Sequence, residues 1–451
     1  LDRVSFLFLP ILNVDGHERI SPLSRVNQRG PDEMGWRTNA RNLNLNRDYA
    51  KLDTPEVRTV VEILDRWRPD LYLDLHVTDG IEKQYDITWG FNGSHGHSPA
   101  IGEWLESSLD PALTQDLEAM GHIPGPHVFV FDRTDPTKGI WAWEGGPRYS
   151  DGYGSARHLA AVLVENHSLK PYEQRVLGTR VLLQSALELL AADGGRLERA
   201  TRADRQRRWT ELPLGWTRDR EPQEEPFDFL AVQQVLTDSP VSGAKRVQWT
   251  GEPITVQVPL YRTTRAIGSV TPPVAYRVPA AWSDVIARLG AHGVEMTVHP
   301  QSETADVEMY RLGEPRFADE LYEGRLRVEA DVEAFRTRET FAASSVRVPV
   351  DQPLGVLVIL LLEPSSPDSF FQWGFFNQVF QRTEYAESYV LEPLAEQMLA
   401  DDPELRTAFE QRLAEDEDFA ASPRQRLYWF YERSPLVDDR WRVYPVAREM
   451  P

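Results

Sequence analysis

The sequence contains no cysteine in 451 residues. This absence excludes disulfide bonds, thiolate metal ligands and cysteine nucleophiles, so any bound metal must be held by histidine and carboxylate side chains. The cellular compartment stays open, because exported proteins can also lack cysteine.

Basic residues are also scarce, since 49 Lys and Arg face 70 Asp and Glu and leave a net charge of −21. An acidic chain repels the phosphates of nucleic acids unless a basic patch overrides the net charge. The most basic stretch, "ERATRADRQRRW" (198–209), alternates its arginines with acids and is typical of a solvated helix face. We therefore expect no nucleic-acid partner.

Long apolar runs are missing too, as none approaches the ~20 residues that a membrane-spanning helix needs, so we expect no membrane partner. A hydrophobic content of 41% indicates a globular protein.

The chain begins with Leu1, and "VSFLFLP" (4–10) is typical of a buried strand that no cap or signal peptide precedes. We expect the chain to be the downstream part of a longer one.

The spacing of apolar residues along the chain predicts three structural regions. Residues 1–210 alternate strand-like and helix-like segments, which predicts an α/β domain built on one sheet. Its expected strands include "LYLDLH", "HVFVFD", "GIWAWEG" and "HLAAVLVENHS", and its expected helices are "TPEVRTVVEILDRW", capped by Thr54, and a long one over 171–209. Residues 211–350 predict a β-rich module with one helix at "AAWSDVIARLGAHG". Residues 351–451 predict a mixed α/β segment that packs on the rest.

Two polar side chains stand where apolar strands end. His76 closes "LYLDLH", and Glu165 closes a run without any polar residue. Such strand ends expose functional groups in α/β folds, and partial burial raises the pKa of a carboxyl group toward that of a general base. His76 is a candidate metal ligand or base, and Glu165 a candidate base. The structural alternatives are a histidine hydrogen bonded to a loop and an acid that caps the next helix or forms a salt bridge.

Four cationic or amide side chains gather in "WRTNARNLNLNRDY": Arg37, Arg41, Asn46 and Arg47. The guanidinium fork matches a carboxylate, and a neighbouring Asn adds a neutral donor. This stretch predicts a site for the anionic end of a substrate. The alternative is a surface loop with ordinary ion pairs.

Four segments, in order, resemble the zinc metallocarboxypeptidases of the carboxypeptidase A and B type. "PILNVDGHE" is similar to the family's Pro-x-x-Asn-Pro-Asp-Gly, and "RTNARNLNLNRDY" to its Arg-x-Asn…Asp-Leu-Asn-Arg-Asn; "DLH" and "LVENHSLKPYEQRV" follow. Val14 replaces a family proline, and Asn44 replaces a family aspartate. The resemblance covers about the first 190 residues and implies a mixed-sheet catalytic domain whose first strands are missing. "LLEPSSPDSFFQWGFFN" and "RLYWFYERSP" resemble the C-terminal extension of large bacterial members.

The resemblance implies a role for each matched residue. His76 would be the third zinc ligand, and Arg37 would polarise the scissile carbonyl and stabilise the oxyanion. Asn46 and Arg47 would hold the terminal carboxylate of a peptide. Glu165 would activate a zinc-bound water.

The family also uses a tyrosine that closes over the substrate. Tyr153 in "RYSDGYGSARH" is the candidate, with Tyr149 as the alternative. The interval from this tyrosine to Glu165 is shorter than in the digestive enzymes of the family, so the preferred side chain of the substrate stays open.

The first zinc motif of the family, His-x-x-Glu, has no match in the corresponding place. "HGVE" (292–295) has the spacing but follows a helix in the later module, and "HGH" (95–97) lies in an expected loop. We expect the motif to lie upstream of Leu1. The chain as given would then hold one zinc ligand of three, too few for tight zinc binding or activity.

These observations predict a zinc-dependent carboxypeptidase that removes residues from peptides with a free C-terminus. By the resemblance alone, the protein would be secreted or periplasmic. Two alternatives stay open: an amidase acting on a non-peptide or cell-wall amide, and a catalytically inactive relative that binds peptides.

Overall fold

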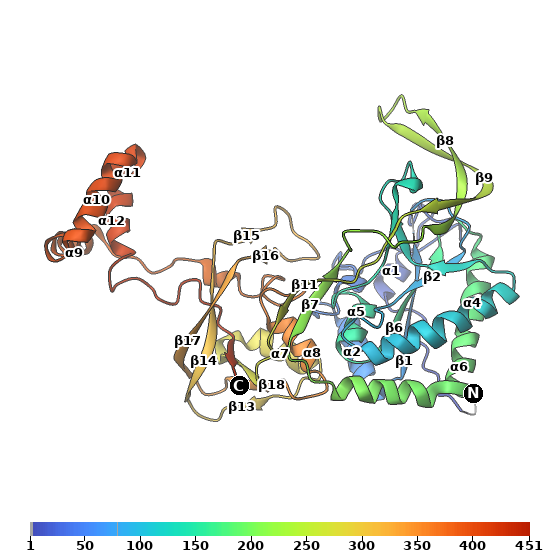
Figure 1. The fold of residues 1–451 in the computed structure, drawn as a ribbon, viewed down its shortest axis with the longest axis horizontal. Coiled ribbons are helices and arrows are strands. Elements are labelled where there is room, and N and C mark those ends of the chain that lie inside the picture. Colours follow the sequence, from blue (N-terminus) through green and yellow to red (C-terminus); the bar gives the residue numbers. More distant parts are fainter. Residues whose placement is uncertain (1–2, 79) are drawn as a thin grey trace.

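The computed structural model describes residues 3–78 and 80–451. Figure 1 shows three parts along the chain: a mixed sheet with its helices near the N-terminus, a second β-rich part, and a small helical lobe at the far end. The whole is mixed α/β, with several sheets and with helices packed against them.

The first sheet has the strand order β1-β6-β2-β3, formed by Leu71–Thr78, Ala160–His167, Ile87–Gly90 and Pro124–Pro126. β1 runs parallel to β6, β6 antiparallel to β2, and β2 parallel to β3. The strands predicted at "LYLDLH" and "HLAAVLVENHS" are confirmed. β6 lies between two strands, as its apolar sequence predicts, whereas β1 lies at an edge and every one of its side chains is half-buried.

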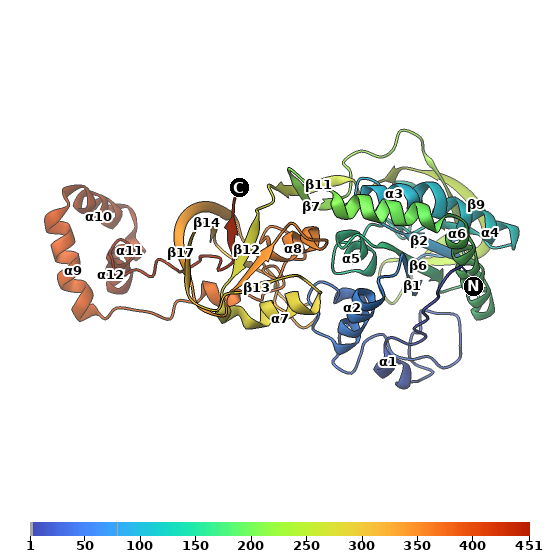
Figure 2. The same cartoon turned by 90° about the horizontal axis from the view of Figure 1, so that it is seen from below.

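The two faces of this sheet differ because side chains alternate along a strand. One face packs on α3 (Pro99–Trp104), α4 (Asp110–Ala119) and α6 (Tyr172–Gln206) through the apolar residues Leu71, Leu73, Leu75, Ala160, Val162 and Val164. Figure 2 shows the sheet between α3 and α6 on one side and α1 (Val14–Glu18) and α2 (Pro55–Trp67) on the other. The second face carries the polar ends of β1 and β6.

Helix α2 begins and packs as its sequence predicts. The hydroxyl of Thr54 accepts a hydrogen bond from the Val57 amide at 3.4 Å, and Pro55 opens the helix. The predicted apolar stripe is buried in full: Val57, Val60, Val61 and Leu64. The long helix predicted over 171–209 is α6.

The segments "HVFVFD" and "GIWAWEG" form strands β4 (Val128–Val130) and β5 (Ile140–Ala142), as predicted. They belong to a separate sheet of order β10-β5-β4, in which β10 is Leu260–Tyr261. The hairpin of β8 (Phe227–Asp238) and β9 (Lys245–Val258) projects at the top of Figure 1. β7 (Leu212–Thr217) pairs with β11 (Arg265–Val270).

A six-stranded antiparallel sheet organises the second part, in the order β13-β18-β12-β19-β14-β17. Its strands are Thr297–Val298, Val346–Pro349, Ala275–Val278, Ala447–Glu449, Glu303–Leu312 and Val332–Phe341, and the pair β15 (Arg316–Phe317) and β16 (Val328–Glu329) lies beside it. The predicted helix is α7 (Ser283–Ala291). Because β19 lies between β12 and β14, the regions divided at residue 350 share one sheet.

Two helical elements complete the chain. α8 (Gly355–Leu362) is buried at every residue, within a core that also contains residues of α2 and α5 (Ser150–Ala156). The lobe of α9 (Ser388–Asp401), α10 (Pro403–Glu415), α11 (Glu417–Ala421) and α12 (Pro423–Tyr431) has a core of its own and stands apart in Figures 1 and 2. Among the described residues, no helix combines the length and the apolar character that crossing a membrane requires.

The expectation of a buried strand over residues 4–10 is wrong. The segment forms no strand, and Phe6, Leu7 and Phe8 are 49%, 57% and 59% exposed. A strand needs a neighbour for its backbone hydrogen bonds, and no described strand pairs with this segment.

Candidate active site

The candidate site lies at the carboxyl ends of β1 and β6. His76 and Glu165 are paired residues in the parallel register of these strands, so their side chains project from the same face of the sheet. This face lies opposite the one that packs on α6. The structure therefore brings the two strand-end candidates together.

His76 is fixed by a carboxylate on its own strand. Its Nε2 lies 2.7 Å from Oδ2 of Asp74, two residues earlier and hence on the same face, and 3.4 Å from Nδ2 of Asn46. Burial alone would lower the pKa of His76, but the carboxylates of Asp74 and Glu165 outweigh it and raise that pKa to about 9. The imidazolium is thus the favoured form in this environment.

Glu165 has the properties of a base that titrates near neutrality. Burial raises the pKa of Glu165 to about 7, with a further upward push from Asp74, while His76, Lys83 and Arg37 oppose the rise. Its Oε2 is buried and accepts no hydrogen bond from the described residues. A carboxylate with such a pKa and a free oxygen can take a proton from a nearby water.

Arg37 is positioned by the "NVDG" segment. Asn13 accepts a hydrogen bond from the Gly16 amide at 3.0 Å and donates one through Nδ2 to the carbonyl of Arg37 at 3.2 Å. The amide of Trp36 donates to the Gly16 carbonyl at 2.6 Å, and a Cβ on Gly16 would lie 2.5 Å from the Trp36 carbonyl oxygen. Only glycine permits this approach. The Arg37 side chain is exposed, and its charge acts on Glu165.

Asn46 and Arg47 occupy a short 3₁₀ turn, Leu45–Arg47, beside His76. Asn46 accepts a hydrogen bond from the Ser150 amide at 3.2 Å, which ties this turn to the start of α5. The Arg47 guanidinium lies 4.5 Å from the centre of the Tyr149 ring and donates to the Asn46 carbonyl at 2.6 Å. Both side chains are half-buried. The structure therefore gathers Arg37, Asn46 and Arg47 around the His76–Glu165 pair.

The structure does not bring Tyr153 to this cluster. Tyr153 is fully buried, its hydroxyl lies 2.9 Å from Nδ1 of His292, and burial raises its pKa to about 12. As the fourth residue of α5 it faces the core, where a substrate does not reach. Tyr149, the alternative, precedes α5 and lies against Arg47, within the cluster.

Sequence reasoning missed Asp74 and Lys83. Asp74 was detectable, because a residue two positions before His76 must share its face of the strand. Lys83 carries no such signal: it is buried in a loop, and burial lowers its pKa to about 8 although the charge of Glu165 opposes the change. Its charge also helps to lower the pKa of the buried His127, after burial itself, to about 3.

The described residues do not make a complete metal site, since no three His, Asp or Glu side chains among them are placed to hold an ion. His292 of "HGVE" is buried against Tyr153 and the Ala50 carbonyl. His95 pairs with Glu144 at 2.7 Å, and His97 lies 2.8 Å from the Pro213 carbonyl.

An aromatic tract leads away from the cluster. Ring contacts run from Tyr149 to Trp143 at 4.7 Å between centroids, then through Phe129 at 5.7 Å and Trp141 at 5.2 Å to Phe131 at 5.2 Å. Several of these rings line a hollow of about 720 Å³ together with Trp216 and Tyr261. Charged side chains line it as well, among them Glu144, Arg218 and Asp219, so the hollow combines aromatic and ionic groups.

The site thus groups a buried carboxylate, Glu165, with guanidinium and amide donors. The chain is similar to fungal proteins named carboxypeptidase 2: it is 24% identical over 357 residues to those of Trichophyton tonsurans and Trichophyton equinum, and 23% identical over 357 residues to that of Trichophyton rubrum. Each alignment covers 74% of this chain and 62% of the relative, so the chain spans less than two thirds of these proteins. No protein-family model and no solved structure matches. The comparisons therefore relate this chain distantly to proteins named carboxypeptidase.

Proposed function

We propose that this chain carries the base and the substrate-binding residues of a zinc carboxypeptidase, which hydrolyses the last peptide bond of a peptide. The observation that carries the proposal is the pairing of Glu165 with His76, with Arg37, Asn46 and Arg47 gathered around them. The names of the relatives agree with this reaction class.

The residues divide the reaction among them. Arg47 and Asn46 hold the terminal carboxylate through charge-assisted hydrogen bonds. The oxygen of a water adds to the scissile carbonyl carbon while Glu165 takes its proton, and Arg37 stabilises the resulting oxyanion. The C–N bond then breaks, and Glu165 passes the proton to the leaving amine.

We propose zinc as the cofactor and His76 as one ligand, in the neutral form that it would adopt by releasing a proton when a metal binds. A bound zinc ion would lower the pKa of the attacking water. The ion would need ligands beyond those that the described residues group together. Metal analysis of the full-length protein that the gene encodes, and of its His76→Ala variant, tests this proposal: less zinc in the variant supports it, and equal, measurable zinc in both contradicts it. Export is proposed on the family resemblance, and fractionation of the producing cells tests it.

The carboxylate clamp is tested with Arg47→Gln and two peptides, one ending in a free acid and one in an amide. Each charged hydrogen bond contributes about 1.5–3 kcal/mol, so the dissociation constant of the free acid, measured by calorimetry, should rise about tenfold or more while that of the amide changes little. Arg66→Gln, which removes an exposed arginine from α2, is the matched control. Equal effects on both peptides would refute the clamp.

We keep as a second candidate a peptide-binding protein without catalysis. Calorimetric titration with a non-cleavable peptide separates the two. Binding that depends on Arg47, with no release of C-terminal residues at any zinc concentration, would replace the enzyme proposal by this one.

A further inference from the structure

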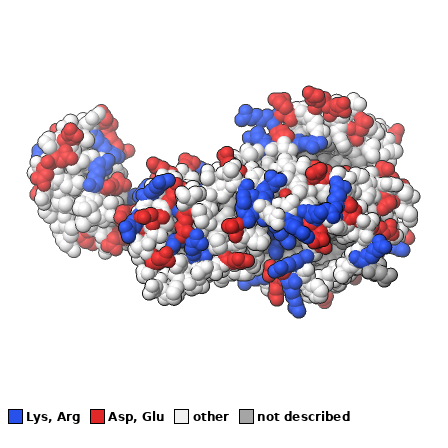
Figure 3. Space-filling view, turned by 60° about the horizontal axis from the view of Figure 1, so that its bottom comes forward, with Lys and Arg blue, Asp and Glu red and all other residues white. Residues whose placement is uncertain are grey.

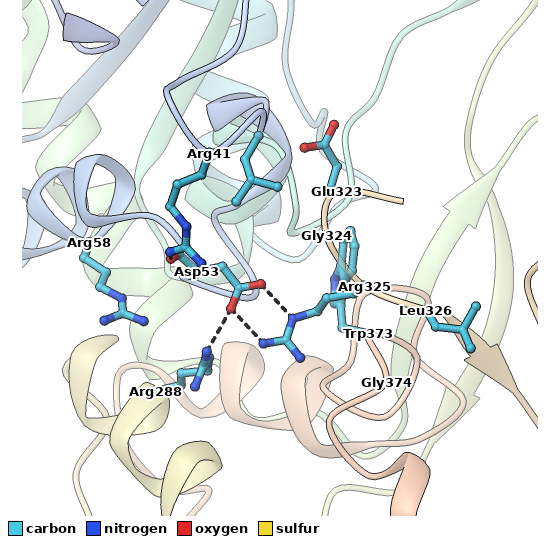
Figure 4. A pocket seen from close by; sticks show the side chains of 11 residues that line it. Arg41, Asp53, Arg58, Arg288, Glu323, Gly324, Arg325, Leu326, Trp373 and Gly374 are labelled. Atoms are coloured by element: carbon cyan, nitrogen blue, oxygen red, sulfur yellow. Dashed lines mark hydrogen bonds and ion pairs between the residues drawn. The ribbon is translucent and has the colours of Figure 1, made fainter. Parts of the chain in front are cut away.

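A second hollow, of about 650 Å³, lies between the first domain and the β-rich part. Such a volume is typical of a small-molecule site. Residues far apart in sequence line it: Arg41, Leu43, Asp53, Arg58, Arg288, Glu323, Gly324, Arg325, Leu326, Trp373 and Gly374. Figure 4 shows that its ionisable side chains come from both parts of the chain.

The lining is basic in a protein that is strongly acidic. Four arginines face two carboxylates, which leaves two uncompensated positive charges, whereas the whole chain carries −21. Figure 3 shows lysine and arginine side chains gathered near the middle of one face of the molecule. A concave site lined by one sign of charge concentrates ions of the opposite sign.

Asp53 neutralises only part of this charge. Its Oδ1 accepts from Nη2 of Arg288 at 2.8 Å and from Nη2 of Arg325 at 2.7 Å, and its Oδ2 accepts from Nε of Arg325 at 2.7 Å (Figure 4). Burial would raise the pKa of Asp53, but the two arginines outweigh it and lower that pKa to about 2. One carboxylate is therefore shared between two guanidinium groups. The second carboxylate of the hollow, Glu323, accepts a hydrogen bond from the backbone amide of Asn44 at 2.8 Å.

The other two arginines have no carboxylate partner within the described part of the chain. Arg58 donates through Nε to the Leu52 carbonyl at 2.6 Å, and Arg41 through Nη1 to the Asp53 carbonyl at 3.2 Å. These bonds fix each side chain against the backbone and leave its remaining N–H groups for a ligand. A guanidinium presents paired donors that match the oxygens of phosphate or carboxylate groups.

We propose that this hollow binds a multivalent oxyanion, a compound with two or more phosphate or carboxylate groups. Arg41 and Arg58 provide the main contacts, on the wall formed by the first domain, and Arg325 completes the site from the β-rich part. This ligand differs from the peptide substrate, and the proposal does not depend on the proposed enzymatic activity. Because the ligand contacts both parts, its binding also stabilises their junction.

Isothermal titration of the intact chain tests the proposal, with pyrophosphate and citrate as separate probes. One site per chain is expected for at least one probe, and the tighter probe identifies phosphate or carboxylate as the preferred group. Arg58→Gln and Arg41→Gln should each weaken binding about tenfold, as the loss of one charged hydrogen-bonding group predicts. Binding should also raise the temperature of unfolding, by an amount that grows with the logarithm of the probe concentration above its Kd.

Arg66→Gln is the matched control, since it removes an arginine from the same helix as Arg58 but outside the hollow. Its affinity should equal that of the unmodified protein. Circular dichroism of each variant verifies that the fold is intact. The proposal is overturned if neither probe binds at millimolar concentration, or if all three variants bind equally well.

Discussion

Ionised Glu165 should destabilise the sheet that carries it, so Glu165→Gln should stabilise that sheet at high pH. The pKa of Glu165 is raised from 4.5 to about 7, which means that the folded state holds the proton more tightly than the unfolded state. At low pH Glu165 is protonated in both states and does not change the free energy of unfolding. As the pH rises from about 4.5 to about 7, the unfolded state loses this proton first, so the free energy of unfolding falls. Integrated between pH 5 and pH 8, the shift corresponds to up to about 2.5 kcal/mol, at about 1.36 kcal/mol per unit.

Hydrogen exchange of peptides spanning β1 and β6 measures this effect locally, which matters because a chain with several cores does not unfold in one step. Comparing variant and unmodified protein at the same pH cancels the intrinsic exchange rates. At each pH, the quantity of interest is the opening free energy of Glu165→Gln minus that of the unmodified protein. This difference should be larger at pH 8 than at pH 5 by about 2 kcal/mol. Glu118→Gln, an exposed change on α4, is the control. A difference that does not vary with pH would refute the reasoning.

Two further predictions concern charges buried near the sites. Lys83→Met should raise the pKa of Glu165 further, because an attracting cation is removed. NMR titration of carboxyl-labelled glutamates measures this pKa, with the Glu165 signal assigned by its loss in Glu165→Gln. An unchanged midpoint would contradict an interaction between the two groups. Asp53→Asn should destabilise the junction by about 2–3 kcal/mol, because two arginines lose their shared carboxylate. The pKa of Asp53 is lowered to about 2 from 3.8, so its stabilisation is present above pH 4 and lost as the pH falls toward 2. Thermal unfolding at pH 7 and pH 2.5 should show a variant effect at pH 7 that shrinks at pH 2.5, and equal effects would contradict this origin.

The parts of the fold that follow from local patterns could be predicted from the sequence. The stripe on α2 and the strands that carry His76 and Glu165 depend only on periodicity, and all three were found in place, although each strand continues two residues beyond the predicted end. The strand expected at residues 4–10 failed because its formation depends on a partner elsewhere in the chain, which periodicity does not reveal.

Some residues of the candidate site could likewise be predicted from the sequence, and others could not. Arg37, Asn46 and Arg47 were recognisable from their spacing and their resemblance to a family motif. Tyr153 was placed in the site although it faces the core, because the residues around it give no sign of which side of a short helix is buried. The Arg288 and Arg325 contributions to the second hollow depend on how two distant segments pack, so no reading of the sequence could place them beside Asp53.

The position of β19 has a consequence for the order of folding. This strand is the last of its sheet in the chain, yet it lies between β12 and β14, in the interior of the sheet. During synthesis the sheet therefore stays in two separate parts until residues 447–449 leave the ribosome. One part consists of β13, β18 and β12, and the other of β14 and β17. Their facing edges stay unpaired during that time and are open to pairing with other chains. The helical lobe of α9–α12 emerges in this interval and can fold on its own core first, so the β-rich part closes only when the strand that joins its halves arrives.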